Sequence, residues 1–323
     1  MADTEYDGQT LKHALKSAEK ILEKKVDEIN ALNVFPVPDG DTGINMYLTL
    51  QSATAAVEEL STRSAAEISA KAARGALLGA RGNSGVILSQ ILRGLAKGLE
   101  MKERFSASDF AHALRCASDT AYRAVGQPVE GTILTVIREA AEVAAQRAQR
   151  GASMKQTVTA IVSQARDSVK RTPELLPKLK EAGVVDAGGK GLMYVFLGMK
   201  NFITVKMNGM EANKATSRQV KFASHDGSYG FDLQFMVEGD SLPVAEMREK
   251  ITGMGESVLV VGDEHLLRVH VHTQQPQAVL DYAAASGKVL DVIMSNMDGQ
   301  VEEFRSSQQT EQRIPDKIPA MKA

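Results

Sequence analysis

The chain has 323 residues, of which 43% are hydrophobic and 24% are charged, and its formal net charge is -2. A chain of this length is too long for one ordinary hydrophobic core and too apolar to be disordered, so we expect two folded units plus tails. Lys and Arg total 38 against 40 Asp and Glu, and no stretch collects the positive charge that a nucleic-acid-binding surface requires.

Two further features concern location and redox chemistry. Residues 1–9 are polar and no apolar secretory segment follows them, nor does any run of about 18 apolar residues occur. We therefore expect a cytoplasmic protein without membrane insertion. Cys116 is the single cysteine, which excludes an internal disulfide and a thiolate metal cluster.

The first two thirds of the chain show helical periodicity. Between Leu11 and Ile29, apolar residues recur every three or four positions, which is typical of a helix with one face in the core. Alanine-rich faces allow helices to approach closely, so we predict an all-α bundle or barrel of about eight helices over residues 1–205. The further helices are expected at about 44–60, 65–78, 84–99, 107–125, 131–149, 154–171, 173–182 and 190–204.

The pattern changes after a polar stretch at residues 206–227, which we interpret as a linker. Alternation from Phe231 to Val237 predicts a strand with one covered and one open face. A helix at about 243–253, strands at 258–261 and 266–272, a helix at 276–286 and a strand at 288–294 complete the order βαββαβ. Residues 228–305 are thus predicted to form a smaller α+β domain of the ferredoxin-like type. The tail at 306–323 lacks periodicity and is predicted to be disordered.

An acidic loop between two predicted helices is the most informative segment. Asp39 and Asp41 flank Gly40, and two prolines restrict the backbone before them, so both carboxylates could face one small volume and bind a hard cation through oxygen. Asn33 could supply a third oxygen. The alternative is an Asx-rich turn that caps the helix beginning near Ile44. Taken alone, the Asp-Gly-Asp pattern does not separate these two interpretations.

Glycine-rich junctions precede several predicted helices. Residues 79–85 place glycines and a hydroxyl before a helix, where free backbone N–H groups favour phosphate oxygens and Arg81 could add charge. Similar junctions occur at 130–132 and 186–191. Each junction alone is equally typical of a tight helix connection. In an up-and-down bundle, however, the acidic loop and these junctions could gather at one end, where a nucleotide would meet several helix N-termini.

Taken in order, the segments 33–46, 82–85, 128–132 and 186–191 resemble the nucleotide-binding domain of the dihydroxyacetone kinase L-subunit superfamily, over about residues 8–205. The resemblance implies a helical barrel or bundle that binds ATP or ADP through two Mg²⁺ ions. It implies that the metal ligands are Asn33, Asp39 and Asp41. It further implies nucleotide contacts from Thr42, Asn45, Gly82, Asn83, Ser84, Thr132, Asp186 and Gly188.

The second domain narrows the resemblance. True L-subunits tend to carry His where this chain has Thr42, and they stop after the helical domain. Residues 228–305, with the segment 269–273, resemble the middle domain of the ATP-binding subunit of bacterial fatty acid kinase. That resemblance implies transfer of the γ-phosphate of ATP to the carboxylate of a fatty acid held by a separate, DegV-like fatty-acid-binding protein, giving an acyl phosphate. Full-length members carry a third domain without a counterpart here, so we expect a short member or a truncated chain.

The chemistry of this reaction suits a site without a general base. A fatty acid carboxylate is already ionised at neutral pH, so positioning and charge neutralisation are the main requirements. Asp39 and Asp41 are the expected catalytic residues, through Mg²⁺, helped by Arg81 or Lys190. The alternatives are a dihydroxyacetone kinase-like phosphotransferase, a non-catalytic nucleotide-binding regulator and a metal-dependent phosphohydrolase. A homodimer is expected by analogy only.

The predicted sheet offers a second candidate metal site. His270 and His272 are two residues apart on a strand and share a face, and Asp232 on the neighbouring first strand could meet them. Two imidazoles and a carboxylate suit Zn²⁺. The fatty acid kinase family tends to carry Cys at the position of Asp232, so this chain departs from the pattern. The alternative is that the three are polar residues on an exposed sheet face.

Overall fold

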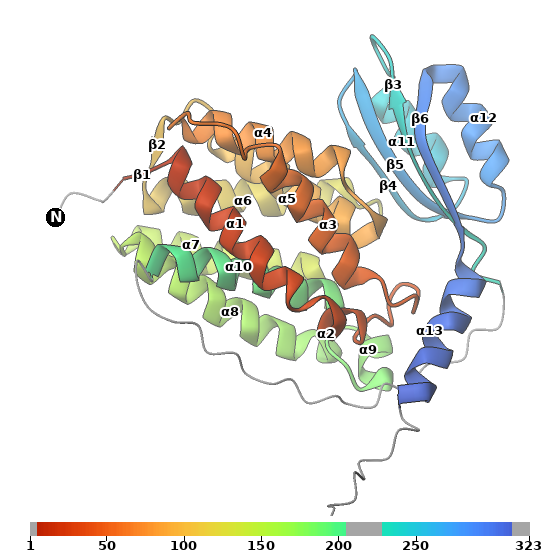
Figure 1. Ribbon diagram of the computed structural model, residues 1–323, viewed down its shortest axis with the longest axis horizontal. Helices are drawn as coiled ribbons and strands as arrows, with labels where there is room; N and C mark the ends of the chain where they lie inside the picture. Colours follow the sequence, from red (N-terminus) through yellow and green to blue (C-terminus); the bar gives the residue numbers. More distant parts are fainter. Residues whose placement is uncertain (1–4, 205–227, 312–323) are drawn as a thin grey trace, which may run out of the picture.

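The computed structural model describes residues 5–204 and 228–311, so the predicted linker at 206–227 lies outside the described residues. Figure 1 shows a helical bundle, a small sheet beside one end of it, and a helix that runs from the sheet along that end. The predicted fold class, a mostly helical domain followed by a smaller α+β domain, is confirmed. Within the described residues, no helix combines the length and apolarity needed to span a bilayer.

The bundle is a closed ring of packed helices in which the first helix contacts the last. Its described helices are α1 (Gly8–Glu23), α2 (Val26–Asn30), α3 (Thr42–Ala55), α4 (Ala65–Leu78), α5 (Gly82–Gly98), α6 (Ala107–Ala124), α7 (Ile133–Gln149), α8 (Met154–Leu175), α9 (Pro177–Ala182) and α10 (Ala187–Thr204). The short strands β1 (Tyr6–Asp7) and β2 (Arg104–Phe105) pair antiparallel at the far end.

Local sequence accounts for many of these boundaries. Capping boxes start α6 and α8, with Ser106 and Ser153 as their N-caps. Close helix packing needs glycine where α5 crosses α6, because a Cβ on Gly94 would lie 2.4 Å from the Cys116 carbonyl oxygen.

Two boundaries differ from the prediction. The apolar stripe between Leu11 and Ile29 belongs to two helices, because the chain leaves helical geometry between α1 and α2 and turns toward the acidic loop. Pro173 lies inside α8 and does not start a new helix; Pro177 starts α9.

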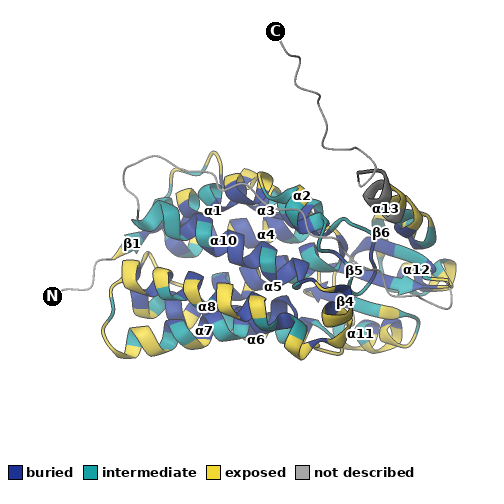
Figure 2. Cartoon of the chain, turned by 90° about the horizontal axis from the view of Figure 1, so that it is seen from below, coloured by how far each residue is buried: buried dark blue, intermediate teal, exposed yellow. Residues whose placement is uncertain are grey.

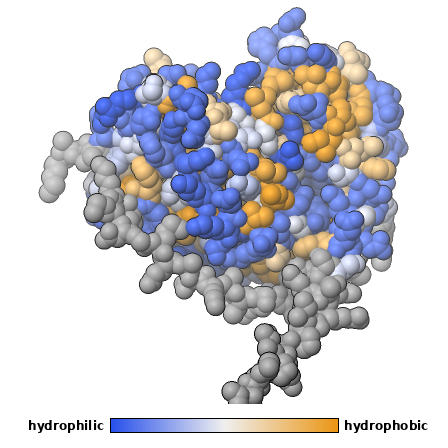
Figure 3. Space-filling view, viewed as in Figure 1, coloured by the Kyte–Doolittle hydropathy of each residue, from blue (hydrophilic) through white to orange (hydrophobic). Residues whose placement is uncertain are grey.

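The second domain has the predicted βαββαβ order. Its elements are β3 (Phe231–Glu238), α11 (Val244–Thr252), β4 (Glu256–Gly262), β5 (Leu266–Thr273), α12 (Pro276–Ser286) and β6 (Lys288–Asn296). The strand order β4-β5-β3-β6, with antiparallel pairs throughout, is that of a ferredoxin-like sheet. Residues Leu233, Phe235 and Val237 pack against α11 and α12 on one face. Figure 3 shows that the visible surface of this domain carries a larger apolar area than that of the bundle.

The other face of the sheet was predicted to be open, and that prediction is wrong. Gln234 and Met236 are each only 6% exposed, and Arg268 is 3% exposed. This face packs against the end of the bundle, where Leu259 and Val261 of β4 join a small apolar cluster with residues of α5 and α6. In Figure 2 the buried colouring continues from α5 into β4 and β5. An alternating pattern cannot reveal this contact, because the polar side chains of the second face are buried at a domain interface.

A further helix, α13 (Met297–Glu311), follows β6 and was not predicted. It extends past residue 306, where the sequence predicts that disorder begins, so the predicted tail is wrong for residues 306–311; residues 312–323 lie outside the described part. Met297 and Val301, one helical turn apart, are buried against Val37 of the acidic loop. The α13 helix exists because that loop offers an apolar surface, which only the folded chain provides.

Candidate active site

A cavity of about 610 Å³ lies between the end of the bundle and the buried face of the sheet. Its walls come from the acidic loop, from the N-terminal ends of α3, α5, α7 and α10, and from β3, β4 and β5. The predicted site residues that line it are Asn33, Asp39, Asp41, Thr42, Gly82, Asn83, Ser84, Thr132, Asp186, Gly188, Asp232, His270 and His272. The fold therefore brings together segments that are far apart in the sequence.

Four helix N-termini converge on this cavity, as the junction pattern predicts. Thr42 begins α3, Gly82 begins α5, Thr132 caps α7 and Gly188 lies in the first turn of α10. Backbone N–H groups at helix N-termini are unpaired and carry the positive end of the helix dipole. The cavity is thus suited to an anion such as a phosphate chain.

The geometry of the acidic loop separates its two interpretations. The side chain that caps α3 is Asn30, whose Oδ1 accepts the N–H groups of Gly43 at 2.7 Å and Ile44 at 3.3 Å. Asp41 occupies the N-cap position but makes no capping hydrogen bond with its side chain. Asn33, which is 2% exposed, donates from Nδ2 to Asp39 Oδ1. The two aspartates are therefore not needed to cap the helix, and both line the cavity.

The electrostatics of these carboxylates favour a cation. Burial raises the pKa of Asp39 well above its usual value, and the charge of Asp41 raises it further. Burial also raises the pKa of Asp41, and the charge of Asp232 adds to the pKa rise of both. Three carboxylates from two domains thus lie close together and repel one another. A hard divalent cation, which takes oxygen ligands, would relieve that repulsion.

Two predicted residues lie elsewhere. Arg81 is exposed and does not line the cavity, so the structure does not support it as a catalytic cation. Lys190, the other predicted cation, is 3.2 Å from a carboxylate oxygen of Glu28 and also lies outside the lining. Asn45 sits behind Asp41, where a side-chain hydrogen bond lowers the pKa of that aspartate.

One lining residue was not selected from the sequence. Lys178 of α9 lies at the rim, with its Nζ 5.6 Å from the centre of the Phe35 ring. Of the described residues that line the cavity, it is the one with a lysine or arginine side chain. A lysine directly after the helix-starting Pro177 gives no functional signal by itself, so only the fold brings it to the site.

The floor of the cavity contains a buried acid. Asp186 is 6% exposed, and its Oδ2 accepts the Gly189 N–H at 2.6 Å, which holds the start of α10. Burial raises its pKa to about 7, although the backbone N–H groups of Gly189 and Ile133 oppose that rise. Asp186 therefore caps a helix and also faces the space that a nucleotide would occupy.

The predicted histidine site forms, but in a buried place. Ligand atoms of Asp232, His270 and His272 all lie within 4.8 Å of one another. Asp232 Oδ1 is 3.1 Å from His270 Nδ1, yet neither atom has a hydrogen-bond partner among the described residues, and His270 Nε2 has none either. Burial lowers the pKa of both histidines to about 3. Neutral imidazoles with unused lone pairs, beside a carboxylate, fit a metal such as Zn²⁺ and do not fit an exposed sheet face.

Polar contacts hold the sheet on the bundle next to this site. Gln234 Oε1 accepts the Gly82 N–H at 3.0 Å, and Arg268 Nη2 donates to the Ala80 carbonyl at 2.6 Å. Asn83 Nδ2 lies 3.4 Å from His272 Nε2. The junction between α4 and α5 is therefore shared by both domains, and so is the cavity.

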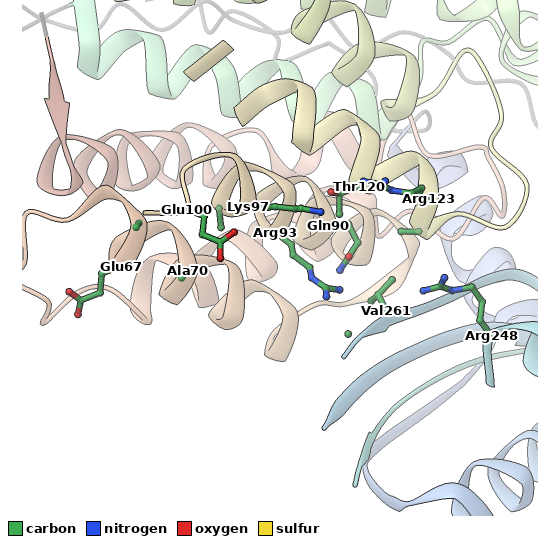
Figure 4. A pocket seen from close by; sticks show the side chains of 14 residues that line it. Glu67, Ala70, Gln90, Arg93, Lys97, Glu100, Thr120, Arg123, Arg248 and Val261 are labelled. Carbon is green, nitrogen blue, oxygen red and sulfur yellow. The ribbon is translucent and has the colours of Figure 1, made fainter. Parts of the chain in front are cut away.

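A second cavity of about 830 Å³ opens as a groove between α4, α5 and α6 and the second domain. Figure 4 shows Arg93, Lys97, Arg123 and Arg248 along it, with Glu67 and Glu100 at the other end. It contains none of the predicted site residues. Although larger, it lacks the grouped carboxylates, imidazoles and helix N-termini of the first cavity, which we take as the candidate active site.

The fold and site define a class of protein: a helical barrel whose converging helix N-termini and acidic loop form a site for an anion with divalent cations. Residues 36–201 match the family described as DAK2 domain, and residues 228–304 match the A-subunit-like family of fatty acid kinase middle domains. The chain belongs to the DAK2 domain family. Together the two matches indicate a kinase-type subunit.

Curated relatives agree with this assignment. Protein YloV of Bacillus subtilis is 39% identical over 306 residues, which are 90% of this chain and 55% of that protein. An uncharacterized protein of Staphylococcus saprophyticus is 38% identical over 304 residues, again 90% of this chain and 55% of the relative. The chain thus spans about half the length of the curated relatives it matches.

Among solved structures, the dihydroxyacetone kinase from C. freundii in complex with AMP-PNP and Mg²⁺ is similar to this chain. The similarity has a TM-score of 0.46 and 17% sequence identity, and it covers 59% of this chain and 33% of that one.

Proposed function

We propose that the chain is the ATP-binding subunit of a fatty acid kinase, which transfers the γ-phosphate of ATP to the carboxylate of a fatty acid held by a separate fatty-acid-binding protein. The observation that carries the proposal is the shared cavity. Asp39 and Asp41 of the DAK2 domain and Asp232 of the middle domain face the same space, beside four helix N-termini. A nucleotide triphosphate with its metal ions matches this combination of charges.

The residues take distinct roles in this proposal. Asn33, Asp39 and Asp41 would hold two Mg²⁺ ions, which when bound neutralise charge on the transferred phosphoryl group. The N-termini that begin at Thr42, Gly82 and Thr132 would hold phosphate oxygens through backbone N–H groups. Lys178 at the rim would add positive charge where the acyl carboxylate approaches. No general base is required, because that carboxylate is ionised at neutral pH.

The histidine site supplies a second part of the proposal. Asp232, His270 and His272 would bind one Zn²⁺ ion, since their ligand atoms lie together and His270 has no hydrogen-bond partner among the described residues. An ion there would stand beside the nucleotide site, because the same cavity is lined by all three residues. It would hold the middle domain in the orientation that completes the acidic cluster.

A phosphoryl-transfer assay tests the proposal. The chain is mixed with ATP, Mg²⁺, oleate and the host's fatty-acid-binding proteins, and ADP and acyl phosphate are measured. Acyl phosphate that depends on both oleate and the binding protein supports the proposal. Phosphate release without either partner would indicate a phosphohydrolase, transfer to dihydroxyacetone would indicate the related sugar kinase, and nucleotide binding without turnover would indicate a regulator. Asp39→Asn serves as the inactive control, and Asp27→Asn on the exposed side of α2 as the matched active one.

A further inference from the structure

The α13 helix links the sheet of the second domain to the acidic loop of the first. At its start the Met297 N–H donates to the Gly230 carbonyl at 3.0 Å, and Asp298 Oδ1 accepts the Tyr229 N–H at 2.8 Å. These contacts fix the helix to the beginning of β3, the strand that carries Asp232. Figure 1 shows α13 below the sheet, next to the end of the bundle.

The side of α13 that faces the bundle is apolar. Met297 and Val301 are 1% and 3% exposed and pack with Val37, which is 6% exposed and lies two residues before Asp39. The next residue on this side, Phe304, reaches the acidic loop itself. A Cβ built on Gly40 would lie 2.2 Å from Phe304 Cδ2, so the aromatic ring rests directly on the Gly40 backbone.

We propose that Phe304 is a positioning residue for the metal-binding loop: carried by the second domain, its ring packs on Gly40 and holds Asp39 and Asp41 toward Asp232. This inference rests on the proposed function, because it assigns a role within the same site. It explains why residue 40 is glycine on two grounds. The backbone there has a φ of +72°, which favours glycine, and the ring leaves no room for a side chain.

The physical reason for such a contact lies in the charges of the loop. Asp39 and Asp41 are both buried, and their charges oppose each other. Without a metal ion, a free loop would lower that repulsion by turning one carboxylate toward water. A ring fixed from outside keeps both carboxylates in place before the cation arrives, which reduces the free-energy cost of binding. Because α13 belongs to the second domain, the loop is held only while the two domains are in contact.

The test compares Mn²⁺ binding, followed by electron paramagnetic resonance in the presence of ADP, in the full chain and its variants. Phe304→Ala is expected to weaken Mn²⁺ binding by about 10-fold or more, the size of effect typical for residues that support metal ligands. Phe304→Leu, which keeps an apolar side chain over Gly40, is expected to restore most of the affinity. Glu303→Ala, an exposed position on the same helix, is the matched control and should bind as the wild type does.

A second comparison keeps the test independent of folding. Gly40→Ala should weaken Mn²⁺ binding strongly, and Gly40→Ala combined with Phe304→Ala should bind better than Gly40→Ala alone, because the clash with the ring is removed. Relief of this kind supports direct contact in solution; its absence contradicts the inference. Metal-free urea unfolding of each variant shows whether the second domain is still folded.

The result of Asp39→Asn separates the two levels of the argument. If Asp39→Asn abolishes Mn²⁺ binding while Phe304→Ala binds normally, the inference about Phe304 is wrong and the metal site stands. If neither variant changes Mn²⁺ binding, the metal site itself is wrong and the inference is lost with it.

Discussion

The Gly82 N–H donates to the Oε1 atom of Gln234 at 3.0 Å, across the boundary between the two domains. Gly82 begins α5 at the candidate phosphate site, and Gln234 lies on the sheet face that buries the histidine site. Gln234 also donates to Asp232 Oδ2 at 2.7 Å. One amide group therefore connects a helix N-terminus of the first domain to an acid of the second.

Replacing Gln234 by Met is expected to destabilise the chain by about 1–3 kcal/mol, because the buried Gly82 N–H loses its acceptor. Urea unfolding measures the change. Gln277→Met on the exposed side of α12 is the control and should stay within about 0.5 kcal/mol of the wild type. Equal stabilities of the two variants would contradict the buried hydrogen bond.

Asp39→Asn is expected to have opposite effects with and without ligand. In the metal-free protein it removes one of two repelling buried carboxylates, so the unfolding temperature should rise, by roughly 2–4 °C for each kcal/mol gained. With Mg²⁺ and ATP the wild type should be stabilised and the variant should not. Thermal shift with and without Mg·ATP checks both halves. A variant that is still stabilised by Mg·ATP would exclude Asp39 as a ligand.

The pH dependence of stability should contain a contribution from Asp186. Its pKa is raised in the folded state to about 7, from an ordinary value of 3.8. The folded state therefore holds the proton more tightly, so this contribution is fully present below pH 3.8 and is lost as the pH rises from there to about 7. The slope can reach about 1.4 kcal/mol per pH unit for one proton. Urea unfolding at several pH values across this range should show the wild type losing stability relative to Asp186→Asn as the pH rises; a constant difference would contradict the raised pKa.

Zinc binding should depend on the three residues of the second domain. The wild type is expected to bind one Zn²⁺ ion per chain, measured by calorimetry and elemental analysis, and His272→Ala should lose it. His265→Ala, at an exposed turn, should bind as the wild type does. Asp232→Cys should retain the ion, because thiolate is a good Zn²⁺ ligand. Loss of binding in Asp232→Cys together with normal binding in His272→Ala would place the ion elsewhere.

Much of the fold could be predicted because periodicity is local. Helical and strand side-chain directions repeat at 3.6 and 2.0 residues, so apolar spacing indicates element type without knowledge of neighbours. The exception at α1 and α2 shows the limit: apolar spacing continues through Lys24 and Lys25, while the chain turns. The α13 helix was missed for a related reason, since its buried residues Met297 and Val301 face a loop of the other domain.

The sequence by itself determined the all-α and βαββαβ segments and the motifs at helix N-termini, because those depend on backbone preference and on residues near one another in the chain. Only the tertiary structure decided which charged groups share the cavity. It places Asp232 beside Asp39 and Asp41, leaves Arg81 outside and gives the capping of α3 to Asn30. The physical reason is that such encounters are set by how whole elements pack, and packing depends on the shape and burial of surfaces that no single segment contains.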